Sequence, residues 1–255
     1  MKKILFLSPA FIVLLALAAC KKEDTASTPT CRINQITESY SNHTIAYAIT
    51  YNANGKIEAI SFTGGSISYA YTANSIVVTA PFFDSASATA TYTLGSDGKP
   101  VNLHVVYSNS SDWDNVNYEY SNGELSKAIY TASYDPNSSD EYFKWKDGNL
   151  DSIVDTRNQD TMTYTFSYYT DKPFQPGDYL FYSAITGDGE ISPFPSLPEL
   201  VNRNLMKSFA SKVSPYEQEY GNITYTFDTQ DKITSIDVES TLTKSTLGSY
   251  QYDCH

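Results

Sequence analysis

Alternation of apolar and small polar residues, with a period of two, is the feature that most constrains the fold of this chain. Between Ile45 and Tyr51, isoleucine and tyrosine occupy every second position, with alanine and threonine between them. Successive side chains of a β-strand point to opposite faces, so this segment has one apolar face and one Ala/Thr face. The sequence therefore predicts an antiparallel all-β protein. The same alternation recurs at 67–71, 162–168, 223–227 and 250–254.

A turn motif separates the alternating segments. A strand ends on a large apolar residue, a short stretch containing Asn or Asp followed by Gly makes the turn, and an apolar residue starts the next strand. At ordinary strand lengths, this meander predicts about 12 to 16 strands in a large sheet that is curved or closed like a barrel. The copies are 51–57, 94–100, 120–125, 145–150 and 227–233, the last with Asp231 in place of glycine.

One region breaks the pattern. Residues 171–200 are rich in proline, which cannot donate to a β-ladder, so they are expected to form a long excursion from the sheet. The next stretch, 199–212, spaces its apolar residues in a way that predicts one short amphipathic helix. The prolines are Pro173, Pro176, Pro193, Pro195 and Pro198, and the apolar residues are Leu200, Val201, Leu205, Met206 and Phe209.

The N-terminus has the pattern of a secretion signal. Two lysines precede sixteen uncharged residues, a stretch too short for a membrane span of about 20 residues and interrupted by Pro9. It ends in Leu17-Ala18-Ala19-Cys20, which resembles the lipobox of bacterial lipoproteins. The resemblance implies that residues 1–19 are removed and that Cys20 is acylated. Residues 20–30 would then be a lipidated tether, and 31–255 a single β domain anchored to the outer membrane.

The tether carries a second candidate targeting signal. Lys21 follows Cys20, where an aspartate would be expected to retain the protein in the inner membrane. Lys22-Glu23-Asp24 resembles the Lys-acidic-acidic export tag of Bacteroidota surface lipoproteins, and it also fits a solvated charged linker. With a net charge of −12, the chain has no excess of basic residues for binding nucleic acid.

Two cysteines remain besides Cys20. Cys31 opens the domain and Cys254 is the penultimate residue. In an oxidising compartment the pair can form a disulfide that ties the first strand to the last, and the alternative is two free buried thiols. No histidine is close to either cysteine in the sequence, so neither a metal site nor a Cys-His nucleophile has local support.

The sequence contains few candidates for chemistry. No phosphate-binding loop, zinc-binding helix or serine-hydrolase motif is present, and His43, His104 and His255 are far apart. No cofactor or metal is therefore expected. Asp188 and Glu190 could form a glycosidase pair within 171–200.

Trp113, between Asp112 and Asp114, has the make-up of a sugar-stacking platform: a flat apolar ring beside hydrogen-bonding groups. The alternative is a tryptophan folded back over the edge of the sheet.

Tyr118, Tyr120, Gly123 and Leu125 form a Tyr-x-Tyr-x-x-Gly-x-Leu signature that resembles the YD-type repeat of secreted β proteins. Together with the lipobox, the terminal cysteines and the proline-rich insertion, residues 31–254 resemble a Bacteroidota lipoprotein family of unknown function with a porin-like fold. The resemblance implies a large curved or closed antiparallel sheet, and it brings no activity and no site residues.

These features predict a lipid-anchored envelope protein whose role is non-enzymatic, either structural or in binding a glycan or another envelope protein. The alternatives are a glycan-acting hydrolase and a carrier that holds an apolar ligand within the curved sheet. A membrane-spanning barrel is disfavoured, because the alternating segments of about 6 to 8 residues are shorter than the 9–11 needed to span. Charges also occur in many strands, and the chain already has an anchor. We therefore expect the aromatic residues to face inward.

Overall fold

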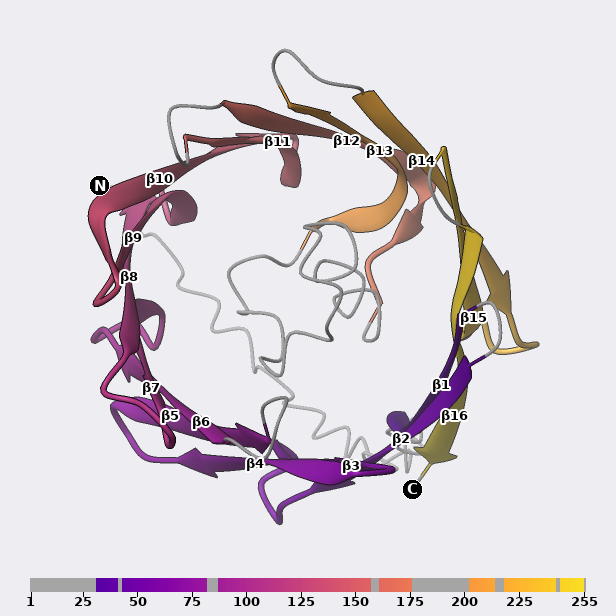
Figure 1. The fold of residues 1–255 in the computed structure, drawn as a ribbon. Coiled ribbons are helices and arrows are strands. Elements are labelled where there is room, and N and C mark those ends of the chain that lie inside the picture. Colours follow the sequence, from indigo (N-terminus) through magenta and orange to yellow (C-terminus); the bar gives the residue numbers. More distant parts are fainter. Residues whose placement is uncertain are drawn as a thin grey trace, which may run out of the picture.

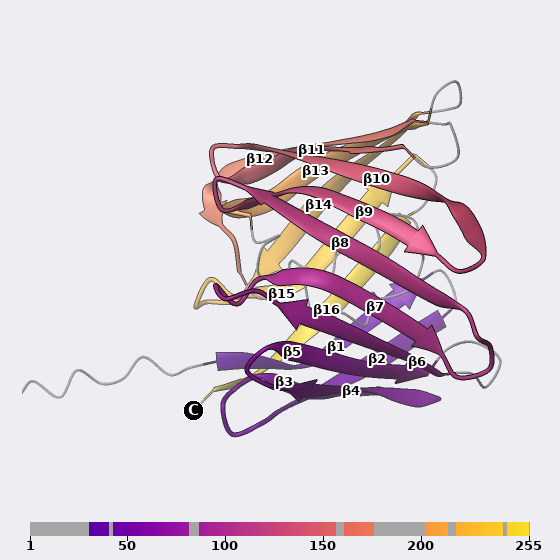
Figure 2. The same ribbon diagram turned by 90° about the vertical axis from the view of Figure 1, so that its left-hand side faces the viewer.

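The protein is a closed barrel of sixteen antiparallel strands, in which each strand pairs with its neighbours in the sequence and β1 pairs with β16 (Figure 1). The computed structural model describes residues 31–40, 43–81, 87–156, 161–175, 202–213, 218–241 and 244–254. Within these ranges all regular structure is β, which confirms the predicted antiparallel meander, and of the two predicted forms, curved or closed, the sheet has the closed one. The strands are tilted relative to the barrel axis, as closure of a sheet requires (Figure 2).

The strands are β1 Cys31–Tyr40, β2 His43–Tyr51, β3 Ile57–Phe62, β4 Gly65–Tyr71, β5 Ser75–Pro81, β6 Ser87–Leu94, β7 Pro100–Tyr107, β8 Trp113–Ser121, β9 Glu124–Ala132, β10 Asp135–Lys146, β11 Asn149–Asp155, β12 Met162–Pro173, β13 Asn204–Val213, β14 Gln218–Phe227, β15 Ile233–Ser240 and β16 Lys244–Cys254.

The helix predicted over 199–212 is wrong. Residues 204–213 form β13, which pairs with β12 and β14, and residues 199–201 lie outside the described part. The register shifts at Lys207, which puts Met206 on the same face as Phe209, and it shifts again between Met206 and Asn204, where Leu205 is buried next to Met206. A β-bulge of this kind breaks the period of two. With Phe209 also buried, the apolar residues have the i, i+1, i+4 spacing of an amphipathic helix.

The predicted turns are confirmed. Gly55, Gly98, Gly123 and Gly148 all have positive φ, between 76° and 84°. Asp231, which stands at the equivalent position of the last copy, adopts φ 60°. Aspartate tolerates this conformation better than most residues, so the last turn keeps the same shape without glycine.

The same hydrogen bonds confirm that equivalence. The turn after β14 has Asp231 N bonded to Asp228 O, and Asp228 Oδ1 accepts from Lys232 N at 2.9 Å. The turn after β2 repeats both bonds through Asn52, whose Oδ1 accepts from Lys56 N at 3.1 Å.

Apolar side chains line the inside of the barrel. The outer face of a closed single sheet lies against solvent, so buried side chains must point toward the lumen. In β2, Tyr47 and Ile49 are buried while Ala46 and Ala48 between them are exposed, and β4, β5 and β14 show the same alternation. Buried residues of fifteen strands form one hydrophobic cluster, against which the partly buried Phe143 and Trp145 of β10 pack. Most aromatic and aliphatic residues of the described strands therefore face inward, as expected.

The outer face is polar. In β4 it carries Ser66, Ser68 and Ala70, and in β14 it carries Asn222, Thr224 and Thr226. The strands themselves have 6 to 12 residues, and β10, β12 and β16 are longer than the expected 6 to 8. Length therefore does not separate this barrel from a spanning one. The polarity of the two faces is the reverse of that typical of a spanning barrel, which is apolar outside and polar inside.

Candidate functional site

Trp113 begins β8 on the outer face of the barrel, beside the connection from β7. Its main chain is fixed by Ser133, whose Oγ accepts from Trp113 N at 2.9 Å and whose N donates to Trp113 O at 2.9 Å. The side chain is 36% exposed, and Val106, paired with it on β7, is also exposed. The His104 ring lies 6.1 Å from the Trp113 ring between centroids, at a tilt of 40°. An indole held in this way offers an accessible flat surface for stacking.

A carboxylate with two tyrosine partners occupies the next position of β8, where alternation points it to the lumen side of the sheet, opposite to Trp113. Asp114 follows Trp113 in β8, and its Oδ2 accepts a hydrogen bond from the Tyr107 hydroxyl. The Tyr134 hydroxyl, from the turn between β9 and β10, also bonds to Asp114. Burial, the Asp114 hydrogen bond and nearby carboxylates raise the pKa of Tyr107 well above its usual range. The same causes raise the pKa of Tyr134.

These raised pKa values bear on the chemistry of the two tyrosines. A general acid or base works best when its pKa is near the working pH, and both tyrosines stay protonated far above neutrality. Tyr107, Asp114 and Tyr134 therefore form a fixed hydrogen-bonded group that does not support proton transfer, and alternation separates it from the indole by the width of the sheet. On the outer face, Trp113 has the exposed Asp112 next to it in the chain, and an indole beside a carboxylate is suited to binding.

The sequence predicts only part of this arrangement. The predicted candidate is Trp113 with its acidic neighbours. It does not include His104 and Ser133, which contact Trp113, or Tyr107 and Tyr134, which bond to Asp114. Their positions depend on the pairing of β7 with β8 and of β8 with β9. The available signal was the aromatic residue within a short polar turn, Ser133-Tyr134, between two alternating segments.

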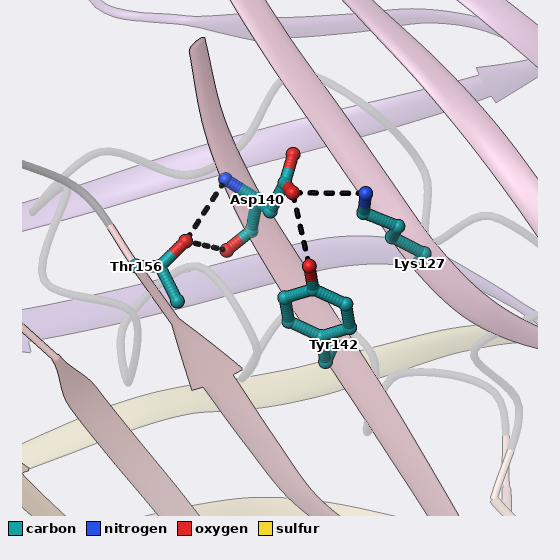
Figure 3. Close-up of polar contacts among 4 residues, drawn as sticks. All are labelled: Lys127, Asp140, Tyr142 and Thr156. Atoms are coloured by element: carbon teal, nitrogen blue, oxygen red, sulfur yellow. Dashed lines mark hydrogen bonds and ion pairs between the residues drawn. The ribbon is translucent and has the colours of Figure 1, made fainter.

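A second polar cluster lies on the outer face of β9 and β10, and Figure 3 shows its four residues. Lys127 Nζ lies 2.8 Å from Asp140 Oδ2, the same oxygen that accepts from the Tyr142 hydroxyl at 3.0 Å. Thr156 Oγ1 donates to Asp140 O at 3.1 Å, which ties the end of β11 to β10. The hydrogen bond from Lys127 lowers the pKa of Asp140, and the same bond raises the pKa of Lys127. This exposed network joins β9, β10 and the end of β11.

Around one end of the barrel, aromatic side chains donate hydrogen bonds to main-chain oxygens of the preceding strand. This end, called here the N-terminal rim, is where even-numbered strands end and odd-numbered strands begin, and it includes Cys31 and Cys254. The Tyr51 hydroxyl donates to Ile33 O at 2.7 Å, and Trp145 Nε1 donates to Leu125 O at 2.8 Å. The same type of bond joins Tyr71 to Ile57, Tyr120 to Pro100, Tyr168 to Leu150 and Tyr252 to Ile233.

The two terminal cysteines are joined. A disulfide links Cys31 of β1 to Cys254 of β16, where these strands pair to close the barrel. Of the two alternatives that the sequence allowed, a disulfide and two free thiols, the structure therefore has the disulfide. The lipidation candidate Cys20 lies outside the described residues.

The remaining candidates lie outside the residues or side chains that the structure describes. Asp188, Glu190 and His255 lie outside the described residues, and so does the His43 side chain. In the ranges that the structure describes, no three His, Cys, Asp or Glu side chains are grouped closely enough to hold a metal ion. Those ranges also contain no helix that is long and apolar enough to cross a membrane.

Solved structures similar to this chain are porin-like proteins of Bacteroides. One, from Bacteroides uniformis, has a TM-score of 0.65 and 14% sequence identity, covering 87% of this chain and 96% of its own. Another, from Bacteroides vulgatus, has a TM-score of 0.65 and 16% identity, covering 87% of this chain and 98% of its own. No family model matches the sequence, and no curated protein matches it. At these identities the likeness shows a shared barrel fold over nearly the whole length of each protein.

Proposed function

We propose that this chain is a lipid-anchored protein of the outer membrane whose barrel stands outside the bilayer and binds a partner without catalysing a reaction. The observation that carries the proposal is the polar outer face of the barrel. A sheet that exposes Ser, Thr and Asn around its circumference has no apolar band to match the hydrocarbon core. Attachment must then come from another part of the chain, and Leu17-Ala18-Ala19-Cys20 supplies a lipidation signal.

The comparisons support the setting of this proposal. The similar solved barrels come from Bacteroides, and the tether carries Lys22-Glu23-Asp24 in the position of an export tag of that bacterial group. Membership of a Bacteroidota lipoprotein family with a porin-like fold is part of the same proposal. Acylation of Cys20 with more than one chain would give stable anchoring, since a single acyl chain binds membranes only marginally.

The anchor is tested by mass spectrometry of the N-terminal peptide from membrane fractions. We expect the mature chain to begin at acylated Cys20, and we expect Cys20→Ser to move the protein to the soluble periplasmic fraction. The matched control is Ser27→Ala in the tether, which should leave fractionation unchanged. An unmodified Cys20 in a protein that still sediments with membranes would refute the anchor.

We assign binding to the surface around Trp113. The partner chemistry that fits is a neutral glycan, since an exposed indole stacks on a sugar ring and the Asp112 carboxylate beside it accepts hydroxyl hydrogen bonds. An anionic glycan would be repelled by Asp112 and by Asp135 at the start of β10.

A glycan array followed by calorimetry tests this assignment. Trp113→Ala should weaken binding of any captured glycan at least about tenfold, the loss expected when an aromatic stacking contact of 1.4 kcal/mol or more is removed. The control is Tyr220→Ala, which removes another exposed aromatic residue on a different part of the barrel. Release of shorter sugars during incubation would favour the hydrolase instead, with Asp188 and Glu190 as the first residues to substitute.

A further inference from the structure

The two ends of the barrel differ in charge. The N-terminal rim is taken as its described connections together with the two nearest residues of each strand, and the opposite rim is taken in the same way. The N-terminal rim carries the cations Arg32, Lys56, Lys99, Lys146, Lys172, Arg203 and Lys232 and the carboxylates Glu58, Asp97, Glu124, Asp147, Asp228, Asp231 and Asp253. The opposite rim carries the cations Lys212 and Lys244 and the carboxylates Asp112, Asp114, Asp135, Asp155, Glu219 and Glu239.

The first rim is therefore balanced in charge, whereas the second has a clear excess of negative charge among its described residues. The described carboxylates are nearly equal in number at the two rims, and the difference arises because the cations gather at the N-terminal rim, although the whole molecule is strongly anionic. A molecule with this distribution has a preferred orientation in any electric field, including that of a charged surface.

Five of the seven cations of the N-terminal rim lie over aromatic rings. Lys56 Nζ lies 4.8 Å from the centre of the Tyr71 ring, and Lys99 Nζ lies 5.1 Å from that of Tyr120. Equivalent cation–π contacts join Arg32 to Tyr51, Lys172 to Tyr169 and Phe227, and Lys232 to Tyr252. Such contacts keep the charge at the end of the barrel, where a surface can reach it.

The tether leaves from this same rim. Cys31 opens β1 there, and only eleven peptide steps separate it from Cys20. A chain of that length spans at most about 40 Å when fully extended. A lipid on Cys20 therefore holds the N-terminal rim within about 40 Å of the bilayer, whereas the opposite rim has no direct tie to it.

We propose that the barrel docks end-on, with the Lys and Arg side chains of the N-terminal rim against the anionic headgroups of the lipids in which Cys20 is anchored, and with the acidic rim and Trp113 facing away. This inference rests on the proposed lipid anchor and adds the orientation. The wall is about 25 Å high at usual strand rise and tilt, against a Debye length of about 8 Å in physiological salt. The acidic rim of the upright barrel thus escapes the repulsion that it would meet if the barrel were inverted.

Vesicles with a quencher on the lipid headgroup test this orientation. The chain from Cys20 onward, which keeps all sixteen strands, is coupled through the Cys20 thiol to a maleimide-bearing lipid after its disulfide has formed. This coupling supplies the anchor whether or not cells acylate Cys20, so failure of the natural anchor is detected separately by mass spectrometry of the native protein.

A fluorophore at Ser96 in the N-terminal rim is compared with one at Asn109 in the opposite rim. Each fluorophore is attached to the new cysteine of Ser96→Cys or Asn109→Cys. This labelling is a separate step from the coupling of Cys20 to the lipid. In vesicles containing phosphatidylglycerol we expect quenching at Ser96 to be about threefold stronger than at Asn109. Phosphatidylcholine vesicles should reduce this ratio.

Two charge-matched variants separate the rim from net charge. Lys56→Gln with Lys99→Gln and Lys232→Gln should bring the ratio in anionic vesicles down to that in neutral ones. Lys127→Gln with Lys144→Gln and Lys207→Gln makes the same change in net charge at positions outside both rims and should leave the ratio unchanged.

A third variant, Asp112→Asn with Asp135→Asn and Glu239→Gln, removes three negative charges from the opposite rim. It should also reduce the ratio, and it leaves the aromatic residues of the N-terminal rim in place. Equal quenching at both positions, or a ratio that is the same in both vesicle types, would overturn the proposal.

Discussion

At the scale of single residues, backbone conformation at the turns is the property that the sequence specifies most directly. Gly98 adopts φ 82°, and a Cβ added there would meet no heavy atom within 4 Å. The requirement for glycine at this position is therefore one of backbone conformation, because left-handed φ is costly for a residue with a side chain.

Gly98→Ala should therefore lower the free energy of unfolding by about 1–2 kcal/mol through backbone strain. Urea denaturation followed by tryptophan fluorescence measures it. Ser96→Ala in the same turn is the control, and it should change the midpoint very little. An unchanged midpoint for Gly98→Ala would show that the turn relaxes to another conformation.

The rim tyrosines make a prediction about alkaline pH. Burial, together with nearby Asp228, raises the pKa of Tyr252 to about 12, while an unfolded tyrosine ionises near pH 10. Because the folded-state pKa is the higher one, the contribution of Tyr252 to stability is complete below about pH 10. It is lost as the pH rises from 10 to 12, where only the unfolded chain ionises.

Urea midpoints measured from pH 8 to 12, together with absorbance at 295 nm, check this expectation. Tyr252→Phe should be less stable at pH 8, because it lacks the bond to Ile233 O, and it should lose less stability than the parent protein above pH 10. A parallel decline of both proteins would mean that Tyr252 ionises equally in the folded and unfolded states.

At the scale of elements, β13 and β14 show how packing decides between helix and strand. Gly221 of β14 pairs directly with Phe209 of β13. A Cβ at Gly221 would collide with the Phe209 ring, so the glycine provides the space in which that ring lies. Phe209 was one of the residues that made 199–212 look helical, and its partner twelve residues later makes it a strand residue.

Gly221→Ala should consequently destabilise the protein by about 1–3 kcal/mol through overpacking. The double substitution with Phe209→Leu removes the collision and should recover part of the loss relative to the sum of the two single effects. Thermal unfolding of the four proteins gives the coupling energy. Strict additivity would show that the ring has room to move aside.

At the scale of the whole molecule, closure of the barrel depends on the pairing of β1 with β16. These strands lie at opposite ends of the sequence, so their pairing closes a loop that includes the entire domain, and the Cys31–Cys254 disulfide secures it. With 223 residues of separation, a cross-link here removes much conformational freedom from the unfolded chain.

The double variant Cys31→Ser with Cys254→Ser should lose about 2–5 kcal/mol of unfolding free energy. Reduction of the parent protein with dithiothreitol should give the same stability as the variant, and the variant should not respond to the reductant. If the oxidised and reduced proteins unfold at the same urea concentration, the strand pairing closes the barrel without help from the disulfide.

Local features of this protein were predictable from the sequence, because they depend on residues close together in the chain. The alternation in β2, the turn at Gly55 and the turn equivalent at Asp231 each depend on a few neighbouring residues whose steric preferences are intrinsic. The closed form of the sheet, the β-bulge at Lys207 and the hydrogen bonds of Tyr107 and Tyr134 to Asp114 were decided by tertiary structure. Each depends on which strands pair and in what register, and that is set by contacts between segments far apart in the chain.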